Sequence, residues 1–349
     1  MLKQNRKETG TIISFLGNNA LIKISINVFT VYVGLVASGY EFSYDKELSE
    51  KIRNVKWDSA AVEYFRKART LYCDVNPYWP RASMLVSASL FLNESDEIEY
   101  TDYKKFKEKT DNLSNIDPKE KEEDTKLWLL QLPTYYSLIR KNEEFNDLWV
   151  HYVKKIESDT PYFMEIINEA KRRVISKFKI TESELPDMEL IPNILGMLHN
   201  ADFERIDDII YVVSAQPDIL TIVHEYLHNI LGHGIKDNIK SIENYVHLLN
   251  PVFDRMLSYK YAWGKDTQSW ARVFEENLIR AATIWVNEPD ESKAIQQSIK
   301  QENGGFAYVP VLLDQFNNNW CGINGISMFI DCCLKACEQR CNAGRINMS

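Results

Sequence analysis

The chain carries little positive charge, and it has no concentrated basic region. Its 41 Lys and Arg residues face 50 Asp and Glu residues, which gives a formal net charge of -9. No patch of basic residues interleaved with aromatic residues occurs along the sequence. Because phosphate binding needs a dense basic surface, we expect no nucleic-acid partner.

A long apolar run is also missing. The charge-free stretch over residues 24–40 contains Asn27 and is short for a membrane helix, which needs about 20 apolar residues. We therefore expect no membrane span. The residues before it are only loosely similar to an export signal, because polar residues such as Lys23 interrupt their apolar stretch. This favours a cytoplasmic location, and export is the alternative if these residues form a degenerate signal.

Dispersed cysteines are missing too, since five of the six lie in the last 29 residues. This spacing is not that of a disulfide framework. Cys333, Cys337 and Cys341 share one helical face, but neither a matching histidine nor a CxxC pair accompanies them, as a zinc site would require. We expect reduced cysteines packed in an apolar helix, with a disulfide as the alternative.

The residues that are present indicate a folded globular protein, since 45% of the 349 residues are apolar and 26% are charged. LIKISIN, from residue 21, predicts a strand, and the overlapping NVFTVYVGLVASG predicts a buried helix capped by Asn27 and ended near Gly39. Residues 45 to about 175 have the apolar spacing of helices. LIPNILGML, from residue 190, and DIIYVVSA, from residue 208, predict two strands.

These patterns predict an α+β fold that is mainly helical and contains a small sheet. The predicted division is a mainly helical N-terminal region with an opening strand over residues 1–185, followed by a second region over residues 186–349. One compact unit is the alternative, because the length of the chain fits either two domains or one large domain.

The second predicted strand leads directly into a helix that contains TIVHEYLHNI, residues 221–230. Each residue of an α-helix turns by about 100°, so His224, Glu225 and His228 fall within one arc. Residues four apart have β-carbons about 5 to 6 Å from one another, so two imidazoles at this spacing can bind one zinc ion. The glutamate then lies beside the open position of the metal, where a general base can act.

The neighbours of these residues make the helix apolar nearly all round, so we expect it to be buried. Two imidazoles and a carboxylate are costly to bury unless something pairs with them, and a divalent cation does so. The pattern therefore favours one Zn2+ ion over a set of satisfied polar core residues. Gly232 and Gly234 predict the end of this helix.

A zinc ion that keeps one water needs a third protein ligand. His233 is the nearest candidate. However, the HExxHxxGxxH pattern of metzincins is not met, because Leu231 and Gly234 occupy its glycine position and its last histidine position. A second helix downstream is the better source of the ligand.

That second helix is DTQSWARVFEENLIRAATIWV, capped by Asp266 or Thr267. Glu276 points almost opposite to its apolar stripe, and Glu275 lies nearer the edge of the stripe. Periodicity does not choose between the two glutamates. Two solvated surface acids are the default interpretation of an isolated pair of this kind.

HEYLH followed downstream by EENLIRAATIW resembles the bacterial domain of unknown function 4932 group, a set of gluzincin-type metallopeptidases with a HEfxH helix and then an ExxxRA helix. Weaker similarities occur in the same order along most of the chain. The resemblance implies a zincin-like pair of active-site helices within residues 186–349. It assigns the three metal ligands to His224, His228 and Glu276, with Arg280 one turn after the last of them.

Two features depart from that family pattern. Thermolysin-like gluzincins place an acidic residue four positions after the ligand glutamate, where it orients a histidine. Arg280 holds that position here, and a guanidinium accepts no hydrogen bond, so the acceptor must lie elsewhere. In addition, the family has an Asn-Pro pair soon after HExxH, whereas Asn250-Pro251 comes about twenty residues later here, behind an insertion relative to that pattern.

The predicted activity is hydrolysis of peptide bonds by zinc-activated water, with Glu225 as the general base. A peptide or protein substrate would pair with the strand IIYVVSA or LIPNILG at the edge of the sheet. Tyr308 and His247 are candidates for stabilising the oxyanion, although both also fit packing or surface roles. The alternative function is a catalytically inactive, peptidase-like binding protein that keeps a structural zinc.

Overall fold

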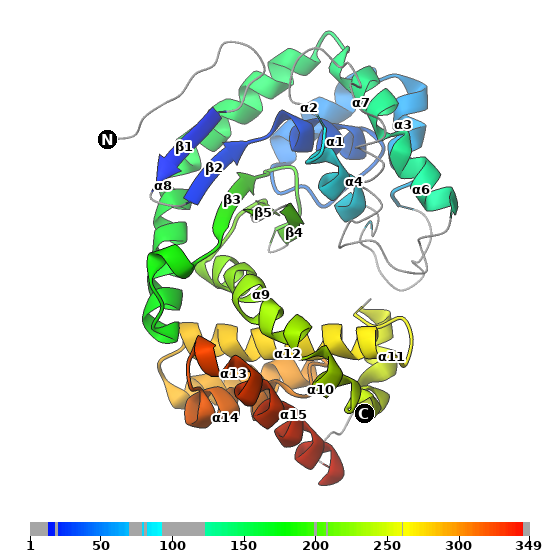
Figure 1. Ribbon diagram of the computed structural model, residues 1–349. Helices are drawn as coiled ribbons and strands as arrows, with labels where there is room; N and C mark the ends of the chain where they lie inside the picture. The colour runs from blue at the N-terminus through cyan, green and yellow to red at the C-terminus, as the bar shows by residue number, and fades with distance from the viewer. Residues whose placement is uncertain are drawn as a thin grey trace. The chain divides into compact units, whose positions relative to one another are not determined.

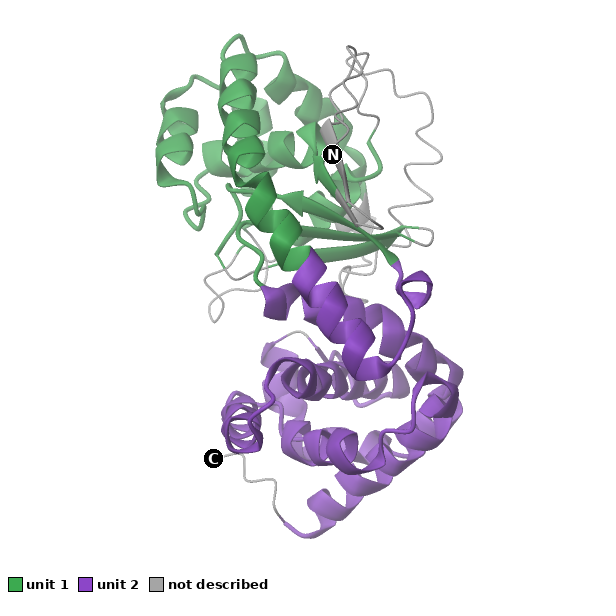
Figure 2. Cartoon of the chain, turned by 90° about the vertical axis from the view of Figure 1, so that its left-hand side faces the viewer, with its two compact units in different colours: residues 1–167, 187–218 green, residues 168–186, 219–349 purple. Residues whose placement is uncertain are grey.

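The computed structural model describes residues 13–17, 20–69, 79, 82–92, 123–198, 201–206, 209–259 and 261–344. The chain forms two compact units (Figure 2). Unit 1 contains Met1–Ile167 and Asp187–Asp218, and unit 2 contains Asn168–Pro186 and Ile219–Ser349. The predicted division near residue 185 falls where the chain passes from unit 2 back to unit 1, and the three strands after it belong to unit 1. Of the N-terminal residues that bear on export, 1–12, 18 and 19 lie outside the described ranges, and 13–17 and 20–24 form two strands.

Unit 1 contains a mixed sheet of five strands in the order β1-β2-β3-β5-β4 (Figure 1). The central pairs β2 with β3 and β3 with β5 are parallel, and the outer pairs β1 with β2 and β4 with β5 are antiparallel. The strands are β1 Ile13–Gly17, β2 Ala20–Ile24, β3 Asp187–Pro192, β4 Ala201–Ile206 and β5 Ile209–Ser214.

The sheet confirms the strands predicted at LIKISIN and DIIYVVSA. It differs from the predictions in the length of the strand from residue 190 and in which strands form its edges. The strand predicted from residue 190 ends at Pro192, where the chain turns. β3 and β5 both have partners on either side, so the expectation that one of them forms the free edge is wrong. The two edge strands are β1 and β4. β4 was not predicted, because its sequence ADFERI mixes charged and apolar residues. Charged residues of this kind are typical of edge strands.

The helices of unit 1 include a nearly fully buried α1. Its N-cap is Ser25, whose side chain accepts from the backbone N–H of Val28, so the prediction that Asn27 caps this helix is wrong. Asn27 lies inside the helix and donates to the carbonyl of Leu92, while Tyr136 donates its hydroxyl to Asn27. The helices are α1 Ile26–Ala37, α2 Lys46–Asn54, α3 Ser59–Arg66, α4 Ala82–Ser89, α6 Glu123–Leu130, α7 Leu132–Arg140 and the first part of α8 Phe145–Phe178.

Unit 2 is built around α12, which packs against α9 on one side and against α14 on another (Figure 1). The predicted cap of α12 is confirmed, because Asp266 accepts from the backbone N–H of Ser269. The elements are the end of α8, η1 Glu182–Glu184, α9 Ile219–Asp237, α10 Ile239–Glu243, η2 Val246–Val252, α11 Phe253–Ser258, α12 Thr267–Asn287, α13 Glu291–Asn303, α14 Val309–Asn319, η3 Ile323–Gly325 and α15 Ile326–Asn342.

The prediction that Gly232 and Gly234 end the motif helix is wrong, since α9 continues to Asp237. Both glycines lie within α9 and allow side chains of other helices to approach its backbone closely. A β-carbon on Gly234 would lie 2.5 Å from Cδ1 of Ile326, and one on Gly232 would lie 3.0 Å from Oε1 of Glu275.

The C-terminal cysteines lie mostly on α15. Cys333 and Cys337 are buried, and burial raises the pKa of both thiols. The five cysteines in the described residues are free thiols. Among all the residues that the structure describes, no helix combines the length and the apolar character that a membrane crossing requires. The fold class is confirmed as α+β, mainly helical, with one small sheet.

Candidate metal centre

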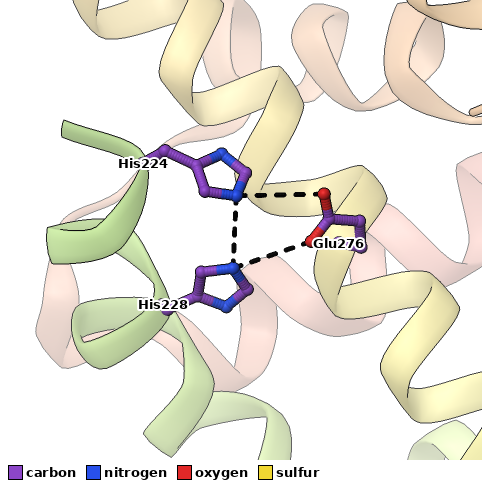
Figure 3. A group of neighbouring side chains, drawn as sticks. All are labelled: His224, His228 and Glu276. Atoms are coloured by element: carbon purple, nitrogen blue, oxygen red, sulfur yellow. Dashed lines mark hydrogen bonds and ion pairs between the residues drawn. The ribbon is translucent and has the colours of Figure 1, made fainter. Parts of the chain in front are cut away.

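Two histidines project from adjacent turns of α9 towards the same point (Figure 3). Their Nε2 atoms are 3.2 Å apart. The helix packs its apolar residues around them, with Ile222, Val223 and Leu227 fully buried. The side chains of His224 and His228 keep 21% and 23% of their surface exposed, so the pair lies at the edge of the core and not within it.

Glu276 reaches the same point from α12 (Figure 3). Its side chain is only 5% exposed. Oε1 lies 3.8 Å from Nε2 of His224, and Oε2 lies 3.6 Å from Nε2 of His228. The three side chains form a group whose possible ligand atoms all lie within 4.8 Å of one another. The structure thus brings together the three residues that the sequence and the resemblance selected.

The spacing of these donor atoms fits a tetrahedral metal ion. With bonds of about 2.0 to 2.1 Å, two ligands of a tetrahedral zinc ion are roughly 3.3 to 3.4 Å apart. The observed separations of 3.2, 3.6 and 3.8 Å lie close to that value. Adjacent ligands of an octahedral ion with bonds of about 2.1 Å would be closer together, at roughly 3.0 Å. The group could therefore hold a tetrahedrally coordinated metal ion such as zinc.

Arg280 holds the carboxylate of Glu276 from the side away from the histidines. Its Nε donates to Oε1 of Glu276 over 2.7 Å, and its Nη1 donates to Gln301 over 2.9 Å. The guanidinium carbon lies 3.7 Å from the centre of the Phe306 ring. Burial alone would raise the pKa of Glu276, but the neighbouring His224, Arg280 and His228 outweigh it and lower that pKa to about 2. The carboxylate is therefore ionised and fixed in place.

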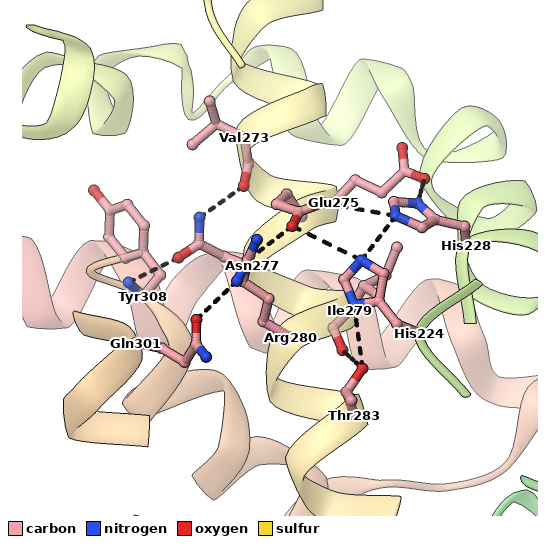
Figure 4. A network of polar contacts seen from close by, with 11 residues as sticks. His224, His228, Val273, Glu275, Asn277, Ile279, Arg280, Thr283, Gln301 and Tyr308 are labelled. Atoms are coloured by element: carbon pink, nitrogen blue, oxygen red, sulfur yellow. Dashed lines mark hydrogen bonds and ion pairs between the residues drawn. The ribbon is translucent and has the colours of Figure 1, made fainter. Parts of the chain in front are cut away.

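The remaining ring nitrogens of the histidines have partners on α12 (Figure 4). Nδ1 of His228 lies 3.2 Å from Oε1 of Glu275, and Nδ1 of His224 lies 3.4 Å from the hydroxyl of Thr283. That hydroxyl donates to the carbonyl of Ile279 over 2.8 Å, so its oxygen is the acceptor for His224. Both Nδ1 atoms then carry the hydrogen, which leaves both Nε2 lone pairs for a cation.

The two histidines differ in charge when no metal is bound. Burial lowers the pKa of His224 to about 3. Burial also opposes the charging of His228, but the hydrogen bond to Glu275 and the charges of Glu225 and Glu276 outweigh it and raise its pKa to about 9. At neutral pH His228 can therefore donate its Nε2 proton to the lone pair of His224 across 3.2 Å. A proton shared between these two Nε2 atoms would compete with a cation for the same lone pairs.

The other residues considered from sequence occupy different environments. Glu225 is 7% exposed, and its charge acts on His228. His233 is exposed, and His247 is half exposed with Nε2 3.4 Å from Glu338. The hydroxyl of Tyr308 donates to the carbonyl of Leu248 over 2.6 Å, in the core of unit 2.

Glu275 and Thr283 are the residues that sequence reasoning missed as partners of the histidines. A signal for Thr283 was present, because it lies seven residues after Glu276 with Arg280 between them at four residues, on one face of α12. Glu275 had no such signal, because its partner His228 lies on α9, which is distant from α12 in the sequence.

Comparisons of the chain with models of known protein families, with curated proteins and with solved structures find no match. The resemblance to the domain of unknown function 4932 group therefore depends on the motif residues alone, and it remains a hypothesis.

Proposed function

We propose that the chain is a zinc-dependent metallopeptidase of the gluzincin type, related to the domain of unknown function 4932 group. The observation that carries this proposal is the convergence of two Nε2 atoms and one carboxylate at separations of 3.2 to 3.8 Å, close to those of tetrahedral zinc. Three protein ligands leave a fourth position for water, which is typical of catalytic zinc and not of structural zinc.

The charges around the ligands support a divalent cation. Glu225, Glu275 and Glu276 bring three carboxylates to the site, and Arg280 brings one guanidinium. With both histidines neutral, as metal ligands must be, this local set has two negative charges in excess. A zinc ion balances them, and a monovalent cation does not.

In the proposed reaction, His224, His228 and Glu276 would hold the zinc ion. When bound, the ion would supply Lewis-acid chemistry, lowering the pKa of the attacking water towards about 7 and polarising the carbonyl of the scissile peptide bond. Glu225 accepts the proton of the attacking water on its carboxylate and passes it to the leaving amine. The substrate is a peptide or a protein.

A four-variant experiment tests the proposal. Purified wild type, Glu225→Gln, His224→Ala and His233→Ala are analysed for zinc per chain and for cleavage of a denatured protein mixture, with and without a chelator. We expect Glu225→Gln to keep zinc and lose cleavage, and His224→Ala to lose both. The exposed His233 serves as the matched control, and its replacement should change neither measurement.

The outcomes separate this proposal from the inactive binding protein with a structural zinc. Zinc in the wild type without cleavage of the mixture would favour the inactive protein. Wild-type cleavage that persists in Glu225→Gln would exclude the assigned base.

A further inference from the structure

The two adjacent glutamates of α12 contact the two different nitrogens of one imidazole, Glu276 as in Figure 3 and Glu275 as in Figure 4. Oε2 of Glu276 lies 3.6 Å from Nε2 of His228, and Oε1 of Glu275 lies 3.2 Å from Nδ1 of the same ring. Glu275 is therefore not a ligand of the proposed ion. The side chain of Glu275 is 27% exposed, so it shields the ring of His228 from solvent only in part.

Gly232 lies one turn after His228 on α9, directly against the Glu275 carboxylate. A β-carbon at this position would lie 3.0 Å from Oε1 of Glu275, which is also the oxygen next to His228. The next atom is Cδ of the same side chain, at 3.8 Å. Glycine in a helix interior is unfavourable by roughly 0.5–1 kcal/mol relative to alanine, so a specific reason for it is needed. The space for this carboxylate supplies the reason.

We propose that Glu275 is a positioning residue for His228 and that Gly232 is the position on α9 that leaves room for it. This inference rests on the proposed zinc site. By accepting a hydrogen bond from Nδ1–H of His228, the carboxylate fixes the orientation of the ring and the tautomer that presents Nε2 to the ion. Glu275 is thus the acceptor behind His228, as Thr283 is the acceptor behind His224.

The first measurement is zinc affinity, determined by competition with a chromogenic chelator. Loss of an acceptor behind a ligand histidine typically weakens metal binding about 10- to 100-fold, and we expect this range for Glu275→Ala. Glu275→Gln should recover part of the loss, because its amide oxygen still accepts from Nδ1. The glutamine variant keeps the shape of the side chain, so it also tests the inference if the alanine variant folds poorly.

The Gly232→Ala variant separates positioning from general packing. Alanine favours the helix, whereas the metal-free protein loses the contact of Glu275 with His228, so its thermal midpoint should change little. The zinc affinity should nevertheless fall, because the new methyl group displaces the carboxylate from His228. A variant that merely disturbs packing would lower both quantities.

A double variant closes the argument. If Gly232 acts only through the carboxylate, Glu275→Ala with Gly232→Ala should bind zinc no more weakly than Glu275→Ala alone. Additive losses would overturn the role assigned to Gly232.

The failure of this inference is distinguishable from the failure of the proposed function. A wild type that binds no zinc, or a His224→Ala variant that binds it equally well, would show that the zinc site itself is wrong. A wild type and a His233→Ala variant that bind zinc tightly, together with an equally tight Glu275→Ala, would overturn the positioning role alone.

Discussion

Replacing Arg280 with methionine should destabilise the metal-free protein and at the same time tighten zinc binding. The guanidinium donates to Glu276 over 2.7 Å and to Gln301 over 2.9 Å, and it lies 3.7 Å from the centre of the Phe306 ring. Methionine keeps an apolar chain of similar length and removes the charge. The carboxylate it leaves behind is 5% exposed.

The size of the effect depends on whether another cation is present. Removal of one partner from a buried ion pair costs about 3–5 kcal/mol, and we expect this range for the metal-free variant. With zinc bound, the ion compensates Glu276. The loss is then reduced to the hydrogen bond to Gln301, about 1 kcal/mol, and part of the contact with Phe306, about 0.5–1 kcal/mol.

Linkage converts the difference into zinc affinity. These ranges differ by about 1–3.5 kcal/mol, so the variant should bind zinc roughly 5- to 300-fold more tightly than the wild type. The physical reason is that Arg280 repels a divalent ion and withdraws charge from its ligand. Urea unfolding with zinc and with a chelator gives the two stabilities, and chelator competition gives the affinity independently.

Arg172→Met is the matched control. Arg172 also pairs with a glutamate in unit 2, at 2.5 Å from Glu169, but its side chain is 71% exposed. An exposed pair of this kind contributes little to stability because solvent screens it, so this variant should respond little and equally with and without zinc. Weaker zinc binding by Arg280→Met would refute the electrostatic reasoning and would indicate that the guanidinium acts mainly by orienting Glu276.

Three further outcomes follow from the pKa values and from the exposure of the thiols. The pKa of His228 is raised to about 9, so zinc must displace a proton below that pH, and its apparent affinity should rise about tenfold per pH unit from pH 7 to 9, as measured by chelator competition. The stability of the metal-free protein should fall over the same pH range. A raised pKa of His228 in the folded state stabilises the protein fully below the unfolded value of 6.5, and this contribution is lost towards pH 9. Urea midpoints at pH 7 and 9 measure the loss. An alkylating reagent should modify the exposed Cys321 before the buried Cys333 and Cys337, as peptide mass analysis can follow, and zinc content should not change.

The helix spacing of His224 and His228 could be predicted because it depends only on local geometry. Four residues make about one turn, and the apolar residues between them require burial, so the imidazoles meet whatever the rest of the chain does. The choice between Glu275 and Glu276 could not be made in this way. α12 is buried against α9 as well as against α14, so the face opposite its apolar stripe is also covered, and periodicity assigns that face to solvent.

The errors at Gly232 and at β4 have a common cause. A glycine near the end of an apolar pattern predicts a helix end, and a charged segment predicts a loop, unless tertiary contacts provide another reason for them. At Gly232 that reason is the Glu275 carboxylate from α12, and at β4 it is the neighbouring strand β5. Neither contact can be predicted from the neighbouring residues in the sequence.

The metal-free and zinc-bound forms of the site should differ little in geometry. The 3.2 Å between the Nε2 atoms of His224 and His228 suits a hydrogen bond through one proton, and it is also close to the roughly 3.3 Å between two ligands of tetrahedral zinc. Asp266 caps α12, and the helix buries its own Trp270 and Phe274 in the core. The helix that carries Glu276 is therefore held by contacts that do not involve the ion. Zinc would therefore bind to an arrangement that the fold already provides. For this reason, removal of the metal should abolish the chemistry while the fold of unit 2 persists.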